Sequence, residues 1–422
     1  MMSPSWRAMT LVFGRIGLLS FGGPAAQIAV MHKELVEERP WLSEQAFLRA
    51  LSFCMLLPGP EAMQLATYAG WRLRGVPGGL LAGLLFVMPG ALIIGVLVGL
   101  YASYGTLDLV QAGFLGIKAS VIVIVLMALR KLANKALHGS NAWALAGIGF
   151  VGIFALNLPF PMIVLGAGLY GLFLGKKDVV SDIEPQGLNA RNAGRQLLIW
   201  GGLWLLPLIA LSLFGASFLA TIGWFFAKLA VVTFGGAYAV LAYMSQTVVE
   251  QYSWISTGQM IDALGLAETT PGPLILVTQF VAMLAGLEAH GPWMGLAAGL
   301  VALWATFMPC FLWIFLTAPY VEQISSHPRL GAALKAITAS VVGVILNLSV
   351  WFALHVLFTE IENRNYGVFS LPVPTLDSLD PIALGLIVLA ALLTFATRGS
   401  MLLTLFLMAL AGICTSLLPF AI

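Results

Sequence analysis

The 422-residue sequence contains little charge: Lys, Arg, Asp and Glu together make up 9% of it, whereas hydrophobic residues make up 60%. A soluble globular domain carries about a quarter of its residues as charged side chains, so this composition excludes one. Apolar segments long enough to cross a bilayer, which takes about 20 helical residues, recur along the chain. The sequence therefore predicts an all-α polytopic membrane protein.

Cysteine, histidine and the motifs of hydrolytic enzymes are also scarce. The three cysteines, Cys54, Cys310 and Cys414, lie far apart in apolar stretches, which excludes a disulfide framework and a Cys-x-x-Cys metal or redox site. The histidines are scattered, and the chain has no Gly-x-Ser-x-Gly, His-Glu-x-x-His or Gly-x-x-x-x-Gly-Lys motif. We therefore expect no enzyme activity, no metal, no cofactor, no ATP drive and no nucleic-acid partner.

An internal repeat organises what the sequence does contain. Residues 21–60 align without a gap on residues 234–273, and 15 of the 40 positions are identical. The identities include Phe-Gly-Gly at 21–23, Trp41 and Pro-Gly-Pro at 58–60, which shared hydrophobicity alone would not place in register. The sequence therefore consists of two homologous halves.

The two halves differ in their basic residues. We predict a first transporter repeat over 1–175 and a second over 196–422, which has an added leading helix and a C-terminal helix pair. A polar linker at 176–195 joins them. Lys and Arg mark short segments of the first half, whereas the matching segments of the second half carry almost none. Because cytoplasmic loops are enriched in Lys and Arg, we expect an inverted-topology repeat with a cytoplasmic N-terminus and linker.

Helix-breaking Gly and Pro residues interrupt the apolar sequence twice in each half, at 22–24, 58–60, 235–237 and 271–273. Such breaks are tolerated at membrane depth only where the freed backbone groups are buried in protein or line a polar cavity. The flanking segments 43–57 and 61–74 are short, so we expect re-entrant hairpins, with two broken but spanning helices as the alternative. Inversion would bring four half-helix N-termini together near the midplane, a place that favours an anion.

Polar residues near the breaks fit an anion site. The apolar helices contain four cations, Arg15, Lys118, Lys228 and Lys335, and hydroxyl groups cluster at Ser20, Thr233, Thr269 and Thr270. An intramembrane cation costs at least about 2.5 kcal/mol unless it is paired or hydrated, and a bound anion would offset that cost. The alternatives are that the Gly-Gly pairs serve helix packing and that the cations extend to the membrane surface.

Three stretches in this order and spacing, FGGPAAQIA, LLPGPEAMQLATYAGW and GGLLAGLLFVMPG, resemble the chromate ion transporter family in its long form with two fused homologous domains. The resemblance covers nearly the whole chain and implies export of chromate across the bacterial inner membrane. Family motif residues map onto Pro24, Glu61 and Gln64 among others. In the second half Ala237 replaces Pro24 and Leu274 replaces Glu61, so the two halves are not equivalent.

The sequence thus predicts a secondary active transporter for chromate, and for sulfate if the site does not distinguish two tetrahedral dianions of similar size. A passive anion channel or a non-transporting sensor is the alternative. The energy source and a homodimeric state stay open, and Glu61 either couples protons to transport or caps its helix. The predicted substrate-binding residues are Arg15, Ser20, Gly22, Gly23, Pro58, Gly59, Pro60, Glu61, Gln64, Lys118, Lys228, Thr233, Gly235, Gly236, Thr270, Pro271 and Gly272.

Overall fold

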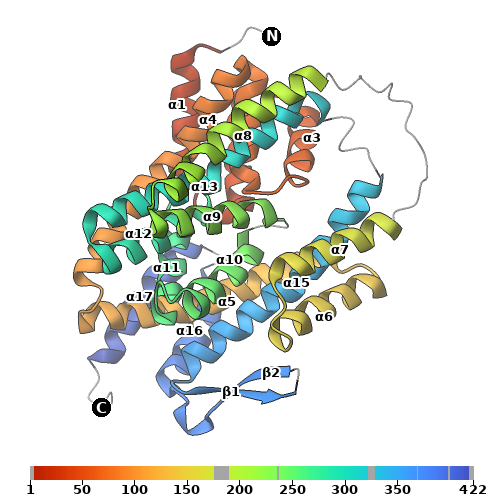
Figure 1. Ribbon diagram of the computed structural model, residues 1–422. Helices are drawn as coiled ribbons and strands as arrows, with labels where there is room; N and C mark the ends of the chain where they lie inside the picture. Colours follow the sequence, from red (N-terminus) through yellow and green to blue (C-terminus); the bar gives the residue numbers. More distant parts are fainter. Residues whose placement is uncertain are drawn as a thin grey trace. The chain divides into compact units, whose positions relative to one another are not determined.

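The computed structural model describes residues 4–174, 190–234, 237–321, 328–367, 369–397 and 400–417. Within these ranges the chain is helical apart from one β-hairpin (Figure 1). Most of the predicted linker at 176–195 lies outside the described residues, and its last six residues begin a helix.

The helices of the second half follow in the same order as those of the first. The first half contains α1 (Trp6–Leu19), α2 (Gly23–His32), the π-helix η1 (Lys33–Glu37), α3 (Glu44–Cys54), α4 (Glu61–Tyr104), α5 (Asp108–Ala136), α6 (Ser140–Phe154) and α7 (Phe160–Leu174). After the leading helix α8 (Ala190–Leu213), the second half contains α9 (Ser217–Val232), α10 (Ala237–Gln246), the π-helix η2 (Thr247–Gln251), α11 (Thr257–Thr269), the 3-10 turn η3 (Leu274–Leu276), α12 (Val277–His290), α13 (Pro292–Thr317), α15 (Pro328–Leu357), α16 (Pro381–Ala396) and α17 (Met401–Ser416). Short 3-10 turns are η4 (Ala318–Tyr320) and η5 (Leu376–Ser378).

Aligned segments of the two halves adopt the same local structure. Trp41 and Trp254 each lie in a turn that follows a π-helix. The backbone N–H of Trp41 donates to the Leu35 carbonyl at 3.0 Å, and that of Trp254 donates to the Val248 carbonyl, the aligned position, at 2.9 Å. A π-helix is rare and occurs mostly as a single turn inside a helix, so its occurrence within one residue of the aligned position supports the repeat.

Helix α4 is two arms rather than one straight helix. The backbone leaves the helical region at Arg74 (φ −145°) and Gly75 (φ +63°). Gly70, before this kink, lies directly against the carbonyl of Gly78, after it, so that even a methyl group would not fit between the two arms. The arms are therefore antiparallel, and the first of them, residues 61–73, extends about 20 Å at 1.5 Å per residue.

The second half contains the matching hairpin. Gly291 (φ +88°) separates α12 from α13, and Gly286 packs closely against Gly295 across the turn. Helix α12 has 14 residues, again about 20 Å against roughly 30 Å of bilayer hydrocarbon. The first arm of each hairpin is therefore shorter than the hydrocarbon is thick. These hairpins turn at Gly75 and Gly291, whereas the expected re-entrant hairpin joins 43–57 to 61–74 and stays a prediction.

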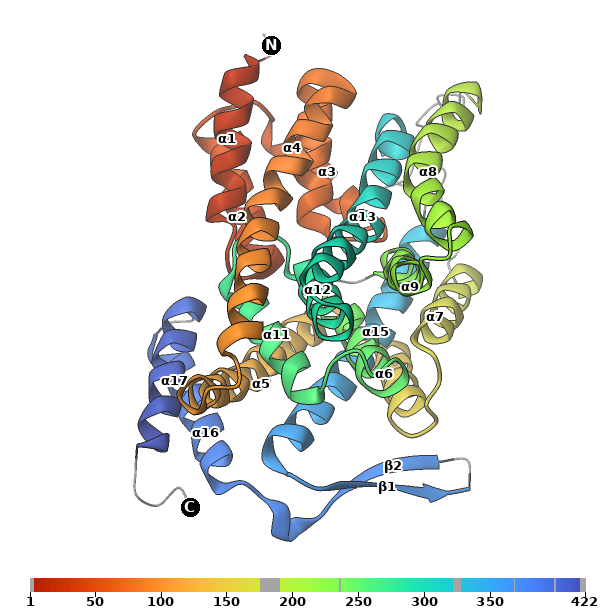
Figure 2. The same cartoon turned by 60° about the vertical axis from the view of Figure 1, so that its left-hand side comes forward.

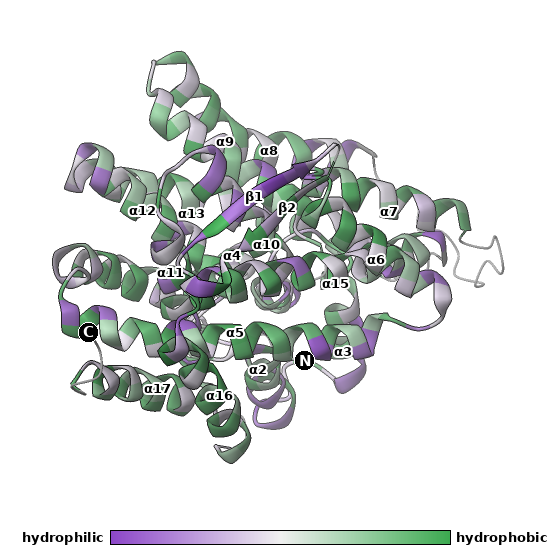
Figure 3. Cartoon of the chain, turned by 90° about the horizontal axis from the view of Figure 1, so that it is seen from below, coloured by the Kyte–Doolittle hydropathy of each residue, from purple (hydrophilic) through white to green (hydrophobic). Residues whose placement is uncertain are grey.

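Five helices among the described residues are long and apolar enough to cross a membrane: Glu61–Tyr104, Asp108–Ala136, Arg191–Leu213, Pro292–Tyr320 and Arg329–Leu357. Figure 3 shows that the helices are mainly hydrophobic, whereas β1 is hydrophilic. Together these features identify a multi-pass membrane protein, as the composition predicts.

The predominantly helical structure agrees with the all-α prediction, and one β-hairpin is an addition to it. The sequence indicates only an acidic loop over 359–380, but strand β1 (Ile361–Tyr366) pairs antiparallel with β2 (Phe369–Pro374). Five of the six β1 residues are exposed, so the strand has no alternating apolar pattern that the sequence could have revealed. The hairpin is held by a backbone hydrogen bond of 2.9 Å from Ser370 to Ala155.

The chain divides into two compact units, and each contains segments from both halves of the sequence. Unit 1 consists of Met1–Val98, Leu172–Ala237 and Thr270–Leu334, and unit 2 of Gly99–Gly171, Tyr238–Thr269 and Lys335–Ile422.

Within unit 2, the long helix of each half packs against the terminal helices of the other half. Helix α5 lies beside α16 and α17 (Figure 2), with Gly116 in direct contact with the Met408 carbonyl of α17. In turn, Gly343 of α15 lies directly against the Ala146 carbonyl of α6. This reciprocal exchange explains why the compact units do not coincide with the sequence halves.

Candidate functional site

The backbone of the break at 22–24 requires glycine. Gly22 and Gly23 have φ of +81° and +80°, in the left-handed region that only glycine adopts without strain. Pro24 follows in the first turn of α2, where its missing N–H leaves no helical hydrogen bond unmade. In the second half, Gly235 and Gly236 lie outside the described residues.

The breaks of the two halves bind one another within unit 1. The Gly59 N–H donates to the Thr233 carbonyl at 2.9 Å, and the Gly272 N–H donates to the Ser20 carbonyl at 2.9 Å. In the repeat alignment, Gly59 corresponds to Gly272 and Ser20 to Thr233. A contact that recurs with its partners exchanged is characteristic of a two-fold relation.

The hydroxyl groups predicted to bind the anion are engaged elsewhere. The Ser20 hydroxyl donates to the Ile16 carbonyl at 2.6 Å, and the Thr233 hydroxyl donates to the Leu229 carbonyl at 2.7 Å. Thr269 likewise donates to a carbonyl of its own helix. In this structure these hydroxyl groups therefore bond to the last turns of their own helices.

A small cavity lies where the breaks meet, and it is bounded by the starts of α2, α4, η3 and α10. Its lining consists of Pro24, Gln27, Gly59, Pro60, Glu61, Ala62, Thr233, Ala237, Pro273, Leu274 and Ile275. The cavity has a volume of about 20 Å³, little more than the roughly 10–15 Å³ that a single water needs. A larger ion therefore requires the loops to separate.

Two buried glutamines hold the loops around this cavity. Gln27 Nε2 donates to the Gly272 carbonyl at 2.6 Å, which joins α2 to the second-half loop. Gln64 Nε2 donates to the Pro58 carbonyl at 2.7 Å, while its Oε1 is buried without a hydrogen-bond partner. The sequence reasoning missed Gln27, although its place one turn after Pro24 in the family motif could have indicated it.

The four predicted cations are not brought together at the cavity, whose lining contains no Lys, Arg or His. Arg15 Nε lies 3.2 Å from Glu34 Oε1, and Lys118 Nζ lies 3.3 Å from Asp262 Oδ1. Lys228 and Lys335 are exposed. The other predicted residues that do not line the cavity are Ser20, Gly22, Gly23, Pro58, Gln64, Thr270, Pro271 and Gly272.

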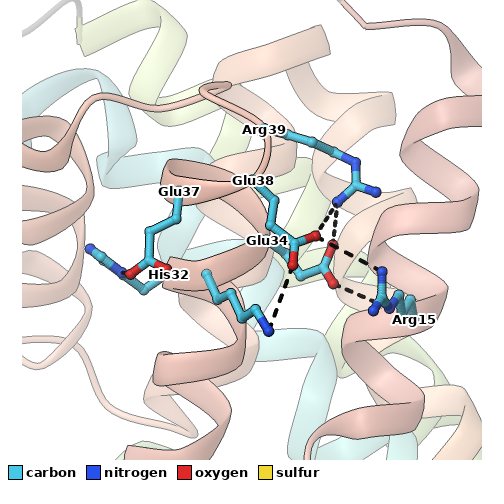
Figure 4. A network of polar contacts seen from close by, with 7 residues as sticks. Arg15, His32, Glu34, Glu37, Glu38 and Arg39 are labelled. Atoms are coloured by element: carbon cyan, nitrogen blue, oxygen red, sulfur yellow. Dashed lines mark hydrogen bonds and ion pairs between the residues drawn. The ribbon is translucent and has the colours of Figure 1, made fainter.

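Figure 4 shows the ion-pair cluster around η1 that contains Arg15. The Glu34 carboxylate, only 3% exposed, lies between Arg15 and Arg39. Residue Thr247 replaces Glu34 at the aligned position, so the cluster belongs to the first half alone. Arg15 therefore has a structural partner that the sequence did not reveal.

His32 joins the end of α2 to the start of α3. Its Nε2 lies 2.6 Å from Glu44 and its Nδ1 lies 3.0 Å from Glu37. The hydrogen bond to the Glu44 carboxylate, with help from Glu37, raises the pKa of His32 above its usual value.

We expect the thermal stability of the purified protein to fall as the pH rises above about 6.5 and passes through the raised pKa of His32. Below pH about 6.5, the pKa of histidine in an unfolded chain, the protonated ring contributes fully to the stability of the folded protein. That stability is lost as the pH rises through the pKa of His32 in the folded protein. His32→Gln should flatten the melting temperature against pH. Parallel pH profiles for the two proteins would contradict a role for His32.

Comparison with known proteins gives consistent matches. The family model described as chromate transporter matches residues 7–172 and 220–414. A probable chromate transport protein of Synechococcus elongatus is 31% identical over 81% of this chain and 83% of its own. A chromate transport protein of Cupriavidus metallidurans is 30% identical over 80% of each chain. An uncharacterized transporter of Bacillus subtilis is 30% identical over 44% of this chain and 97% of its own length. No solved structure matches the chain significantly.

Proposed function

The chain belongs to the chromate transporter family, and we propose that it is a secondary active transporter that exports chromate across the bacterial inner membrane. The observation that carries this proposal is the reciprocal pair of hydrogen bonds, Gly59 to Thr233 and Gly272 to Ser20. It joins the helix breaks of both halves around one cavity, which is the arrangement that repeat-based transporters use for their substrates.

We propose that the anion binds at the first turns of α2, α4 and η3. The N–H groups of a first turn have no acceptor inside their own helix, and the helix dipole is positive there. A dianion supplies the acceptors and the negative charge. Because the cavity lining has no cation, these helix ends are the source of positive potential in the proposed site.

Glu61 is the one charged residue in the cavity lining, at the first turn of α4. Its carboxylate competes with an incoming dianion for the same N–H groups and the same positive field. In this proposal the residue therefore sets how tightly chromate binds, and Leu274 at the aligned position has no such role.

The proposed halves, 1–175 and 196–422, have inverted topology. The reciprocal hydrogen bonds support a two-fold relation, and the excess of Lys and Arg in first-half loops supports an axis in the membrane plane. A cysteine introduced in the 36–42 loop should be labelled from the cytoplasm, and one in the 251–258 loop from the periplasm. Labelling of both loops from one side would contradict inversion.

Counterflow in proteoliposomes tests transport directly. Vesicles that contain the purified protein and are loaded with unlabelled chromate should transiently concentrate labelled chromate from outside, because exchange carries label inward against unlabelled anion. A passive channel would dissipate the gradient without this accumulation, and a sensor would carry no flux. Either result would contradict the proposed function. The same assay with sulfate in place of chromate measures selectivity.

A further inference from the structure

Helix α11 carries two buried carboxyl groups that the proposed anion site does not use. Asp262 is 1% exposed and Glu268 is 5% exposed. The aligned first-half residues are Arg49 and Met55, so these acids belong to the second half alone. An ionisable residue within the membrane is costly unless it is paired, and it is therefore a candidate for function.

Asp262 has a compensating charge. Lys118 Nζ of α5 lies 3.3 Å from its Oδ1, and the Tyr101 hydroxyl donates to its Oδ2 at 2.8 Å. Helix α11 approaches α5 closely here, because Gly265 leaves no room for a side chain beside Ile117. Asp262 therefore has the partners of a stable buried ion pair.

Glu268 has no such partner. The Tyr238 hydroxyl donates to its Oε1 at 2.7 Å, and no Lys, Arg or His of the described chain forms an ion pair with it. Of the helices packed against α11, α5 contributes Lys118, which pairs with Asp262, and α17 has no charged residue. Helix α10 contains no charged residue. Burial without a cation disfavours the charged form of a carboxyl group, so this side chain is suited to take up a proton.

Glu268 lies close in the chain to the helix break at 271–273. It lies four residues before Gly272, whose N–H binds the Ser20 carbonyl in the reciprocal pair. In the chain, Glu268 therefore directly precedes the segment whose residues Pro273, Leu274 and Ile275 line the cavity. Glu61, by contrast, lies in the lining itself, where the anion competes with it directly.

We propose that Glu268 is the proton-binding group of this transporter and that Tyr238 positions its carboxylate. The proposal rests on the proposed chromate transport. The carboxylate takes a proton from water on one side of the membrane to become the neutral acid, and it returns that proton on the other side while chromate moves in the opposite direction. Asp262 and Lys118 stay paired throughout.

The test measures labelled chromate flux in proteoliposomes with and without an imposed pH gradient. Wild-type protein should exchange chromate without a gradient and move it faster with one. Glu268→Gln, which imitates the neutral acid, should retain exchange but lose the acceleration. Glu362→Gln, an exposed carboxylate on β1, is the matched control and should respond to the gradient as wild type does.

A second variant covers the case in which Glu268→Gln does not fold. The Tyr238 hydroxyl stabilises the carboxylate form, so Tyr238→Phe should move the pH at half-maximal flux upward by about one unit. An unchanged pH profile in Tyr238→Phe would overturn the proposal. So would acceleration by the gradient in Glu268→Gln, or a wild-type protein that exchanges chromate but ignores the gradient. Absence of any exchange by wild-type protein would instead contradict the proposed function.

Discussion

Gly59→Ala and Gly272→Ala should each reduce chromate transport at least about tenfold while the protein still reaches the membrane. Gly59 has φ of +121° and Gly272 has φ of +93°, where a residue with a side chain is strained by roughly 1–3 kcal/mol. Both N–H groups make the reciprocal hydrogen bonds that join the halves. Relief of the strain would move the loop and break its bond, and the proposed cavity would lose its wall.

The matched control is Gly14→Ala in α1. Gly14 has an ordinary helical backbone, and no atom lies within 4 Å of the position that a methyl group would occupy. Transport and membrane level should therefore stay at wild-type values. Gly59→Ala or Gly272→Ala protein that is present at wild-type levels and transports normally would contradict the role of the reciprocal contact.

Lys118→Met should sharply lower the amount of folded protein, because it leaves the Asp262 carboxylate buried without its cation. Loss of one partner of a buried ion pair typically costs about 3–5 kcal/mol. If Lys118 instead binds the anion, as the sequence analysis predicts, this variant should lose chromate resistance while it remains in the membrane. The ion pair of 3.3 Å, with Asp262 only 1% exposed, supplies the structural reason for the different expectation.

The double variant Lys118→Met/Asp262→Asn shows whether Lys118 serves to neutralise Asp262 or to bind the anion. It removes both charges and keeps an acceptor for the Tyr101 hydroxyl, so folded protein and chromate resistance should both recover. Size-exclusion chromatography measures the folded protein, and growth on chromate measures the resistance. Recovery of the folded protein without resistance would show that Lys118 serves the anion directly, as the sequence suggests.

The helices can be predicted from the sequence because each is marked by a continuous run of apolar residues. Long apolar stretches of the sequence form, for example, α5 (Asp108–Ala136) and α7 (Phe160–Leu174). The breaks are equally local, since Gly and Pro fix backbone geometry wherever they occur. The β-hairpin was missed because its polar strands carry no periodic pattern.

The partners of the charged residues could not be predicted in the same way. Lys118 and Asp262 are separated by 144 positions in the sequence, and only the packing of α5 against α11 brings them together. Glu34 is much closer to Arg15 in sequence, but the π-helix η1 turns its carboxylate toward both Arg15 and Arg39. Sequence position shows which cations are intramembrane, whereas tertiary structure decides whether an acid or a substrate neutralises each one.

The central claim is that chromate binds where the helix breaks of the two halves meet. Anomalous diffraction at the chromium absorption edge, from crystals grown with chromate, tests it most directly. We predict a single strong peak in unit 1, within hydrogen-bonding reach of the first-turn N–H groups at Ala62 and Ile275 and beside the Gly59–Thr233 contact. A peak at Lys118 or at Arg15, with none between the breaks, would contradict the account.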